Sequence, residues 1–274
     1  ATVVGYLKKE TYTKEDLDKI GDSAPADVKQ AKNIMYSIYA AGKDASYIQD
    51  MKEYASSQLE ANLNVNFDGR AVVGDDINDI NDTNYGDNDV MGDREHAKHG
   101  THVSGIIAQT RHNGIGGDGV ASEVAEIMSL RAVPDGDEYD KDIALAIRYA
   151  ADNGAKVING SFGKYFAQNS KWVQDAIKYA ASKDVLIVVA AGNDAMDLNP
   201  ASGDVERYPN DRELNAKAEF ADNFLVVGAL NPKFGEGMIA NFSNFGHVDV
   251  DVFAPGVQIY ATTPHGKYEF LQGT

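Results

Sequence analysis

Two stripes of apolar side chains at helical spacing stand out near the N-terminus of the chain. Residues three and four positions apart share one face of an α-helix, so each stripe predicts an amphipathic helix. Gly42 lies between the stripes and predicts a helix end, so we expect a helical hairpin within residues 13–63 whose apolar faces pack into a core. The first stripe comprises Val28, Ala31, Ile34, Met35 and Ile38, and the second comprises Ile48, Met51, Tyr54, Ala55 and Leu59.

After His99 the pattern changes to short apolar runs that alternate with amphipathic segments of helical length. This alternation is typical of βαβ units, in which parallel strands are joined through helices. We therefore expect an α/β fold with a mostly parallel central sheet, preceded by the inserted helical hairpin. The expected strands are 124–133, 157–158, 185–191, 224–229 and 250–253, and the expected helices are 141–153 and 171–183.

The segment from Asp75 to Asp93 is rich in Asp, Asn and Gly, residue types that favour turns, and it predicts a loop. Its side-chain oxygens suit calcium, but an EF-hand register that starts at Asn81 places Gly92 where the bidentate glutamate belongs. The EF-hand is therefore rejected. Two interpretations stay open: a solvated acidic loop, and a calcium site of another kind whose ligands are unknown.

The chain shows neither an internal repeat nor a low-complexity linker, and no apolar run approaches the roughly 20 residues needed to cross a bilayer. We therefore expect two parts and no membrane span. Residues 1–88 are predicted to form the hairpin and the acidic loop, packed on a second domain, residues 89–274, that holds the sheet.

Composition excludes several classes of function. The 274 residues include 42 Asp and Glu against 25 Lys and Arg, and the formal net charge of -17 repels the phosphates of nucleic acids. The chain has no cysteine, which rules out disulfides, thiol catalysis and cysteine-ligated zinc. Nucleic acids and anionic membrane surfaces are therefore not expected as partners.

His99 is the first candidate for chemistry. It opens the segment H-G-T-H-V-S-G, residues 99–105, whose glycines and serine leave room for a substrate beside the imidazole. With an ordinary pKa of about 6.5, an imidazole can exchange protons at neutral pH, so His99 is a candidate general base. Two alternatives stay open: a structural histidine, and a metal site shared with His102, which lacks the glutamate of the H-E-x-x-H pattern.

Two further candidates follow apolar runs directly. Gly192 and Asn193 come after the strand expected at 185–191, and sites in parallel sheets form where strands end. The carboxamide of Asn193 is therefore placed to donate a hydrogen bond to a developing oxyanion. The segment Ser161–Gly163 follows another expected strand, and its backbone can pair with an extended peptide. A plain turn is the competing interpretation at both places.

Three motifs, in this order and spacing, resemble those of the subtilisin-like (subtilase) serine peptidases: H-G-T-H-V-S-G at 99–105, I-N-G-S-F-G at 158–163 and V-A-A-G-N-D at 189–194. The similarity continues through Y-P-N at 208–210, F-S-N-F-G at 242–246 and D-V-F-A-P-G-V-Q-I-Y at 251–260, so that it covers residues 89–274 approximately. The region before His99 is more loosely similar to an insertion found in a bacterial envelope subset of the family. The resemblance implies a three-layer, subtilisin-like α/β fold.

The resemblance also implies roles for individual residues. His99 would be the general base and Asn193 the oxyanion-hole donor of a serine endopeptidase, and Gly192 would border the primary specificity pocket. The strand that binds the substrate backbone would be Ser161, Phe162 and Gly163. The resemblance further implies a peptide or protein substrate, no cofactor for catalysis, room for a structural calcium ion, and an extracellular, periplasmic or cell-envelope location.

Two members of the family's catalytic triad have no match. The Asp-Ser/Thr-Gly motif is absent, and its nearest imitation, Asp68–Gly69, follows residues that alternate between apolar and polar instead of a buried run. The closing Gly273–Thr274 is similar to the stretch that leads into the nucleophilic serine. We therefore expect the acid upstream of Ala1 and the serine directly after Thr274, so that the chain is a piece of a longer peptidase and inactive alone.

Two other classes of function compete with the enzyme. A non-catalytic subtilase homologue would bind extended peptides through the Ser161–Gly163 strand, and the residue after Thr274 discriminates between the two. A nucleotide-binding domain would need a glycine-rich loop between a strand and a helix, whereas Gly114–Gly119 precedes an expected strand. Nucleotide binding is therefore rejected.

Overall fold

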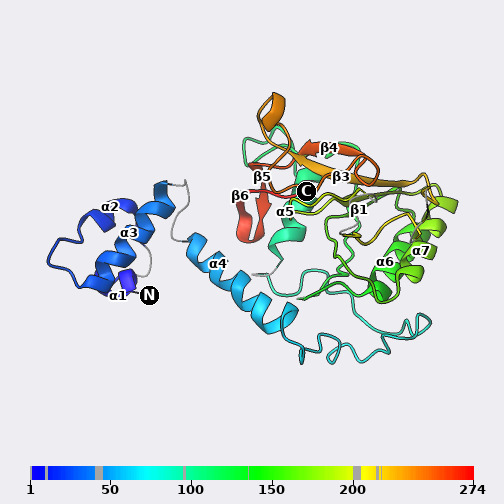
Figure 1. The fold of residues 1–274 in the computed structure, drawn as a ribbon, viewed down its shortest axis with the longest axis horizontal. Helices are drawn as coiled ribbons and strands as arrows, with labels where there is room; N and C mark the ends of the chain where they lie inside the picture. Colours follow the sequence, from blue (N-terminus) through cyan, green and yellow to red (C-terminus); the bar gives the residue numbers. More distant parts are fainter. Residues whose placement is uncertain are drawn as a thin grey trace. The chain divides into compact units, whose positions relative to one another are not determined.

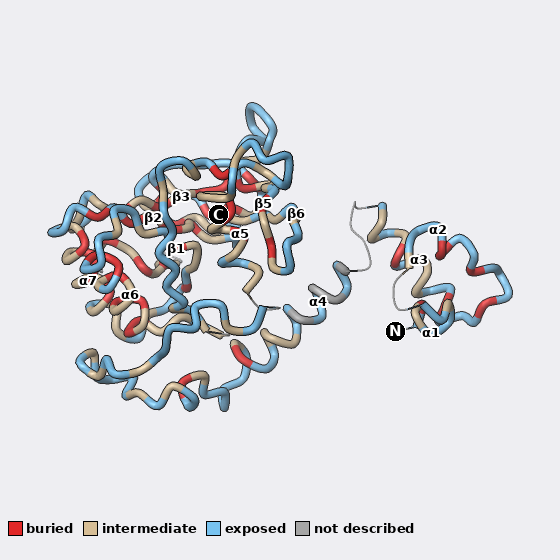
Figure 2. The backbone as a smooth tube through the Cα atoms, turned by 180° about the vertical axis from the view of Figure 1, so that it is seen from behind, coloured by how far each residue is buried: buried red, intermediate tan, exposed pale blue. Residues whose placement is uncertain are grey.

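The computed structural model describes residues 2–9, 12–40, 46–94, 97–134, 136–199, 205–213, 216 and 218–274. The chain divides into two compact units, Ala1–Gly69 and Arg70–Thr274. Each unit has buried residues of its own (Figure 2).

The first unit is helical (Figure 1). Its elements are α1 (Thr2–Leu7), α2 (Lys14–Asp18), α3 (Ala26–Ala40), α4 (Ser46–Ser57) and a π-helical turn, η1 (Gln58–Asn62). Helix α3 lies against α1 and α2, and the small core between them includes Val3, Leu17, Val28 and Met35. Val28 and Met35 lie two turns apart on α3, so the first apolar stripe contributes to a core as predicted, except for Ile34, which is 51% exposed.

The two helices expected from the apolar stripes are confirmed as α3 and α4, but the second stripe is not packed into the core of its unit. Ile48, Met51, Tyr54 and Leu59 are between 44% and 68% exposed. A helical pattern defines which residues share a face, whereas burial of that face needs a partner surface, which the core cluster of this unit does not provide within the described residues. The helix end expected at Gly42 lies outside the described residues.

The second unit is built on a parallel sheet (Figure 1). Its strands are β1 (Val157–Gly160), β2 (Leu186–Ala190), β3 (Phe224–Leu230), β4 (Val252–Pro255), β5 (Ile259–Thr263) and β6 (Lys267–Leu271), its helices are α5 (Lys98–Ala108), α6 (Asp140–Asp152) and α7 (Ser170–Ser182), and its 3-10 turns are η2 (Gly235–Gly237) and η3 (Pro264–Gly266). The first four strands pair in parallel in the order β1-β2-β3-β4, while β5 and β6 form an antiparallel hairpin. This arrangement confirms the predicted α/β fold.

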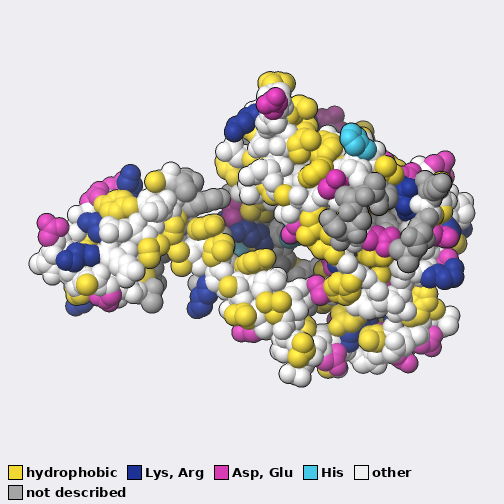
Figure 3. Space-filling model, in the orientation of Figure 1, with side chains coloured by type: hydrophobic (Ala, Val, Ile, Leu, Met, Phe, Trp, Pro, Cys, Tyr) yellow, Lys and Arg dark blue, Asp and Glu magenta, His cyan; other side chains and the backbone are white. Residues whose placement is uncertain are grey.

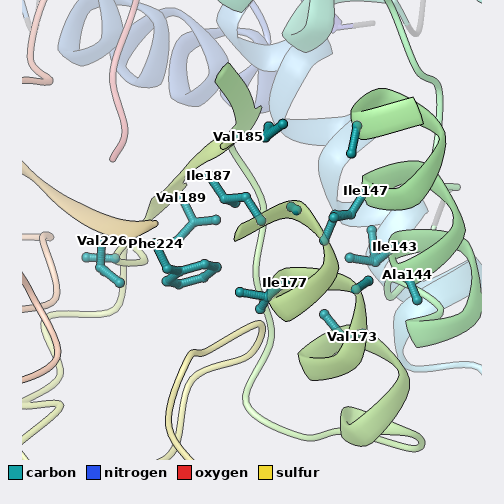
Figure 4. Packing of buried hydrophobic residues seen from close by; sticks show 14 of the residues in the cluster. Ile143, Ala144, Ile147, Val173, Ile177, Val185, Ile187, Val189, Phe224 and Val226 are labelled. Carbon is teal, nitrogen blue, oxygen red and sulfur yellow. The ribbon is translucent and has the colours of Figure 1, made fainter. Parts of the chain in front are cut away.

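The core of the second unit lies where α6 and α7 pack on the sheet (Figure 4). Ile143 of α6 and Ile177 of α7 join Ile187 and Val189 of β2 in one cluster of buried side chains. Ile187 and Val189 alternate with less buried neighbours, as the period of two in a strand requires. Each such side chain contributes roughly 1.5–3 kcal/mol by leaving water, so this cluster fixes the helices against the strands.

Residues 124–133 do not form the strand that their apolar content predicted. Val124 is 89% exposed, and the backbone from Ala125 to Val133 has no regular structure. Within the described part of the chain β1 pairs only with β2, and no strand pairs with residues 124–133. The prediction was wrong because an apolar run becomes a strand only where a neighbouring strand takes up its backbone hydrogen bonds.

A buried ion network ties the acidic segment to helix α6. Asp75 pairs with Arg70 at 2.6 Å and with Lys141 at 2.7 Å, and the Asp75 and Lys141 side chains are 0% and 1% exposed. Arg70 also pairs with Asp142 of α6. The second compact unit therefore begins at Arg70 and includes acidic residues that the sequence grouped with the helical hairpin. Among the described residues no group of three or more His, Asp or Glu side chains is arranged to hold a metal ion, and the calcium alternative stays a prediction.

Tyr85 offers a test of this network, because its hydroxyl donates a hydrogen bond to Asp142 Oδ1 at 2.6 Å. We expect Tyr85→Phe to lower the free energy of unfolding by about 1.5–3 kcal/mol, since a partly buried hydrogen bond to a charged group is lost. Urea unfolding followed by circular dichroism measures this change. Tyr179→Phe is the matched control: its bond to Asp152 is exposed, so its loss should cost less than about 0.5 kcal/mol. Equal losses would mean that the network adds no more than an exposed contact.

Candidate active site

The carboxyl ends of β1 and β2 bring two of the predicted segments to one edge of the sheet. These strands pair in parallel register up to Gly160 and Val189. The segments that follow them, Ser161–Gly163 and Gly192–Asn193, therefore leave the sheet at the same edge. Sites in parallel sheets form at this edge, as the sequence analysis expected.

Asn193 is held by the last residue of the chain. Its Oδ1 accepts hydrogen bonds from Thr274 N at 2.9 Å and from Thr274 Oγ1 at 3.1 Å. The same hydroxyl oxygen accepts a hydrogen bond from Gly192 N at 3.1 Å. Within the described part of the chain the Asn193 Nδ2 group donates to no protein atom, so its N–H groups are left for an incoming acceptor.

A second amide, Asn244, fixes the turn that presents Asn193. Asn244 is completely buried, and its Oδ1 accepts bonds from Asp194 N at 3.1 Å and Met196 N at 2.9 Å. Its Nδ2 donates to Ala191 O and to Tyr165 Oη, both at 2.9 Å. One side chain therefore bonds to residues on both sides of Asn193.

Gly192 cannot be replaced without disturbing that arrangement. Its φ of +107° lies in the region that favours glycine, and an added Cβ would fall 2.4 Å from Asn244 Nδ2 and 2.9 Å from Tyr165 Oη. The sequence analysis placed Gly192 at the site but did not assign a role to Asn244. In the sequence, the only feature that pointed to Asn244 was its place as a polar residue between apolar residues in the F-S-N-F-G motif.

His99 and His102 occupy different environments on the first turns of α5. His99 is exposed at the surface, whereas His102 is buried with its Nε2 at 3.1 Å from Ile259 O and 3.2 Å from Glu269 O. Carbonyl oxygens accept, so His102 Nε2 carries a proton and cannot be a metal ligand, and among the described residues no group of three or more potential ligand side chains includes this pair. The metal site that His99 and His102 were considered to share is therefore disfavoured, and His102 holds α5 to the β5–β6 hairpin.

The β5–β6 hairpin also connects the helix of His99 with the turn of Asn193. Helix α5 packs on β5, and β6 leads directly into the residues that bind Asn193. On this segment Gly273 N donates to Gly256 O at 2.9 Å, and a Cβ at Gly273 would lie 3.6 Å from Asn193 Nδ2. His99 and Asn193 do not bond to each other, but they belong to elements joined through this one hairpin. Asp68, the nearest imitation of the missing acid motif, is an exposed residue of the first unit.

The Ser161–Gly163 segment is already partly engaged by other residues. Ser161 Oγ accepts from Asn159 Nδ2 at 2.9 Å, and Phe162 O accepts from Arg207 Nη2 at 2.9 Å. Gly163 N donates to Glu138 Oε1 at 3.1 Å. A peptide that pairs with Gly163 N would have to displace the Glu138 carboxylate.

Although His99 is partly exposed, the atoms packed around it remove enough hydration to lower its pKa from the ordinary value of 6.5, and the neighbouring His102 lowers it further. Both effects disfavour the imidazolium, so the neutral form that can accept a proton predominates at neutral pH. We expect the His99 ring protons, followed by NMR in the 274-residue chain, to titrate with a midpoint below 6.5. The same protons in the urea-unfolded chain provide the reference, near 6.5. A midpoint at or above the reference would contradict the expectation.

Comparison with known proteins gives a consistent family assignment. The model of the subtilase family matches residues 9–274. The thermophilic serine proteinase of Bacillus sp. (strain AK1) is 34% identical over 238 residues, which cover 86% of this chain and 49% of that protein. Thermitase of Thermoactinomyces vulgaris is 34% identical over 177 residues, or 64% of this chain and 55% of that protein. The chain thus spans about half the length of these curated relatives.

Solved structures agree with this assignment. Sphericase is 31% identical, with a TM-score of 0.53 over 64% of this chain and 58% of that chain. S41 psychrophilic protease is 32% identical, with a TM-score of 0.54 over 70% of this chain and 62% of that chain. The second unit therefore has the α/β architecture of these proteases.

Proposed function

Because this chain belongs to the subtilase family of serine peptidases, we propose that it carries part of the catalytic site of a serine endopeptidase. The observation that carries the proposal is the geometry of Asn193, whose Oδ1 is held by Thr274 while its Nδ2 donors are left unused. In this proposal Asn193 donates to the oxyanion and His99 is the general base. Substrate would bind along Ser161, Phe162 and Gly163, beside Gly192.

The serine of the proposed reaction follows Thr274 in the full-length polypeptide. This placement is supported by Thr274 N, which bonds to Asn193 Oδ1 at 2.9 Å, because the next residue then begins beside the oxyanion donor. His99 takes the hydroxyl proton as the serine oxygen attacks the peptide carbonyl, and later gives that proton to the leaving amine. An aspartate from upstream of Ala1 would orient the imidazole. Asn193 stabilises the negative charge of the tetrahedral intermediate, and catalysis needs no cofactor.

We further propose peptide or protein substrates and a location outside the cytoplasm, on the basis of the family and of the net charge of -17. None of the helices in the described residues is long and apolar enough to traverse a bilayer. A calcium ion, if bound, would be structural.

The 274-residue chain is expected to leave a fluorogenic peptide uncleaved, whereas the polypeptide that continues beyond both ends should cleave it. The reason is chemical: without the serine no acyl intermediate can form. Release of the fluorophore over several hours measures the rate for both. Turnover by the 274-residue chain that His99→Ala abolishes would show that the nucleophile lies within these residues and was misplaced.

A further inference from the structure

One buried cation beside the proposed site, Arg207, forms no ion pair among the described residues. Arg207 is 7% exposed, and the carboxylate of Glu138 acts on it only electrostatically, without a close contact. Its Nη1 donates to Pro209 O at 2.8 Å and its Nη2 to Phe162 O at 2.9 Å. A guanidinium has five N–H donors, so three remain, and the buried Nε has no partner at all.

Arg70, another well-buried arginine, has the carboxylate partners that Arg207 lacks among the described residues. The side chain of Arg70 is 8% exposed and pairs with both Asp75 and Asp142. No carboxylate among the described residues pairs with Arg207 in this way, and burial lowers its pKa to about 10, which still leaves it charged at neutral pH. A buried charge that lacks a partner destabilises the fold, so its presence calls for a ligand or a structural reason.

Arg207 lies directly against the predicted substrate strand. A Cβ added at Gly163 would fall 3.0 Å from Arg207 Nη2 and 3.2 Å from its Nε, so any larger residue there would press against this edge of the guanidinium. Arg207 also interacts with Tyr165, whose hydroxyl lies 2.9 Å from the position that a Cβ at Gly192 would occupy. The cation thus sits between the two segments that leave the sheet edge, one ending at Gly163 and the other at Gly192.

We propose that Arg207 binds the carboxylate of an aspartate or glutamate side chain in the substrate, at the residue on the acyl side of the scissile bond. This inference rests on the proposed peptidase function. The unused Nε and Nη donors form a planar fork that matches a carboxylate, and a desolvated guanidinium favours an ionised partner over a neutral amide of the same shape. Glu138 interacts with Arg207 electrostatically, but it accepts a hydrogen bond from Gly163 N and forms no ion pair with the guanidinium.

The net negative charge of the molecule works against the binding of any acidic peptide. With 42 acidic and 25 basic side chains, and acidic groups spread over the face shown in Figure 3, the long-range field repels acidic peptides. A preference for glutamate over glutamine must therefore come from a local cation and not from general attraction.

Two fluorescent peptides that differ only by Glu or Gln at this position test the inference by anisotropy with the 274-residue chain. We expect the Glu peptide to bind at least about tenfold more tightly, the effect of one hydrogen bond to a charged group. Arg207→Met should abolish the difference and Arg207→Lys should keep part of it. Arg148→Met removes a guanidinium that stacks on Tyr179 of α7 and should leave the difference intact.

Equal binding, tighter binding of the Gln peptide, or no binding of the Glu peptide at millimolar concentration would overturn the inference, whether or not Arg207→Met folds. Cleavage by the full-length polypeptide separates this result from the proposed function. Cleavage without a Glu preference removes the role of Arg207 and keeps the peptidase. Absence of cleavage together with a Glu preference in binding removes the peptidase and keeps the carboxylate site.

Discussion

Replacing His99 with alanine in the full-length polypeptide is expected to lower kcat by about 10⁶-fold, the loss measured when the triad histidine of subtilisin is removed. Without the imidazole the serine proton has no acceptor, and the nucleophile remains a neutral hydroxyl. The lowered pKa of His99 means that the wild-type rate should already be high at pH 7, since the neutral base predominates there. Initial rates at saturating fluorogenic peptide measure the loss.

His112→Ala is the matched control for this substitution. The His112 side chain is 71% exposed and contacts Asp118, outside every segment assigned to the site. Its replacement should leave kcat within about twofold, as surface substitutions usually do. If His99→Ala kept more than about 1% of the wild-type kcat, the loss would be too small for a general base, and His99 would have to be reassigned.

Removing the carboxamide of Asn193 is expected to lower kcat by about 10²–10³-fold with little change in KM, the effect known for the oxyanion-hole asparagine of subtilisin. The donor acts on charge that develops only in the transition state, so the loss appears in kcat. Asn193→Ala removes both the donor and the acceptor that holds Thr274. Asn193→Asp keeps an acceptor for Thr274 N, but it removes the donor and adds a negative charge that repels the oxyanion.

Comparison of these two variants separates catalysis from positioning. If Asn193→Asp loses at least as much activity as Asn193→Ala, the site must stabilise negative charge; if Asn193→Asp remains active, the cause is the anchoring of Thr274. Asn231→Ala serves as a control because the Asn231 amide bonds to Ile239 O at an exposed place. A rise in KM at unchanged kcat in Asn193→Ala would contradict the oxyanion role, since it would indicate uniform binding.

The helices and strands that could be predicted are those with a clear period of apolar residues. Helices α6 and α7 and strands β1–β4 all coincide with expected segments, because each segment contains the apolar period of its own type of structure. The apolar content of 124–133 and of the stripe 48–59 was equally clear. Both are exposed, since burial there depends on a partner that the periodicity of one segment cannot reveal.

The site shows the same division. The resemblance of the motifs around His99, Gly192 and Asn193 to those of the subtilases implied acyl transfer before any contact was known. The roles of Asn244 and Arg207 were not predicted, because a lone polar or basic residue in a sequence is ordinarily exposed. Each became a candidate only when folding buried it among backbone atoms of distant segments.

By itself, the sequence determined the parallel α/β class, the resemblance to the subtilase family and the acidic character of this protein, since periodicity, motif spacing and charge are local or additive properties. Only the tertiary structure decided that Thr274 bonds to Asn193, that His102 anchors α5 and that a guanidinium without an ion pair among the described residues lies against Gly163. These contacts join residues far apart along the chain. They depend on how the strands align and what the packing excludes from water, which no single segment specifies.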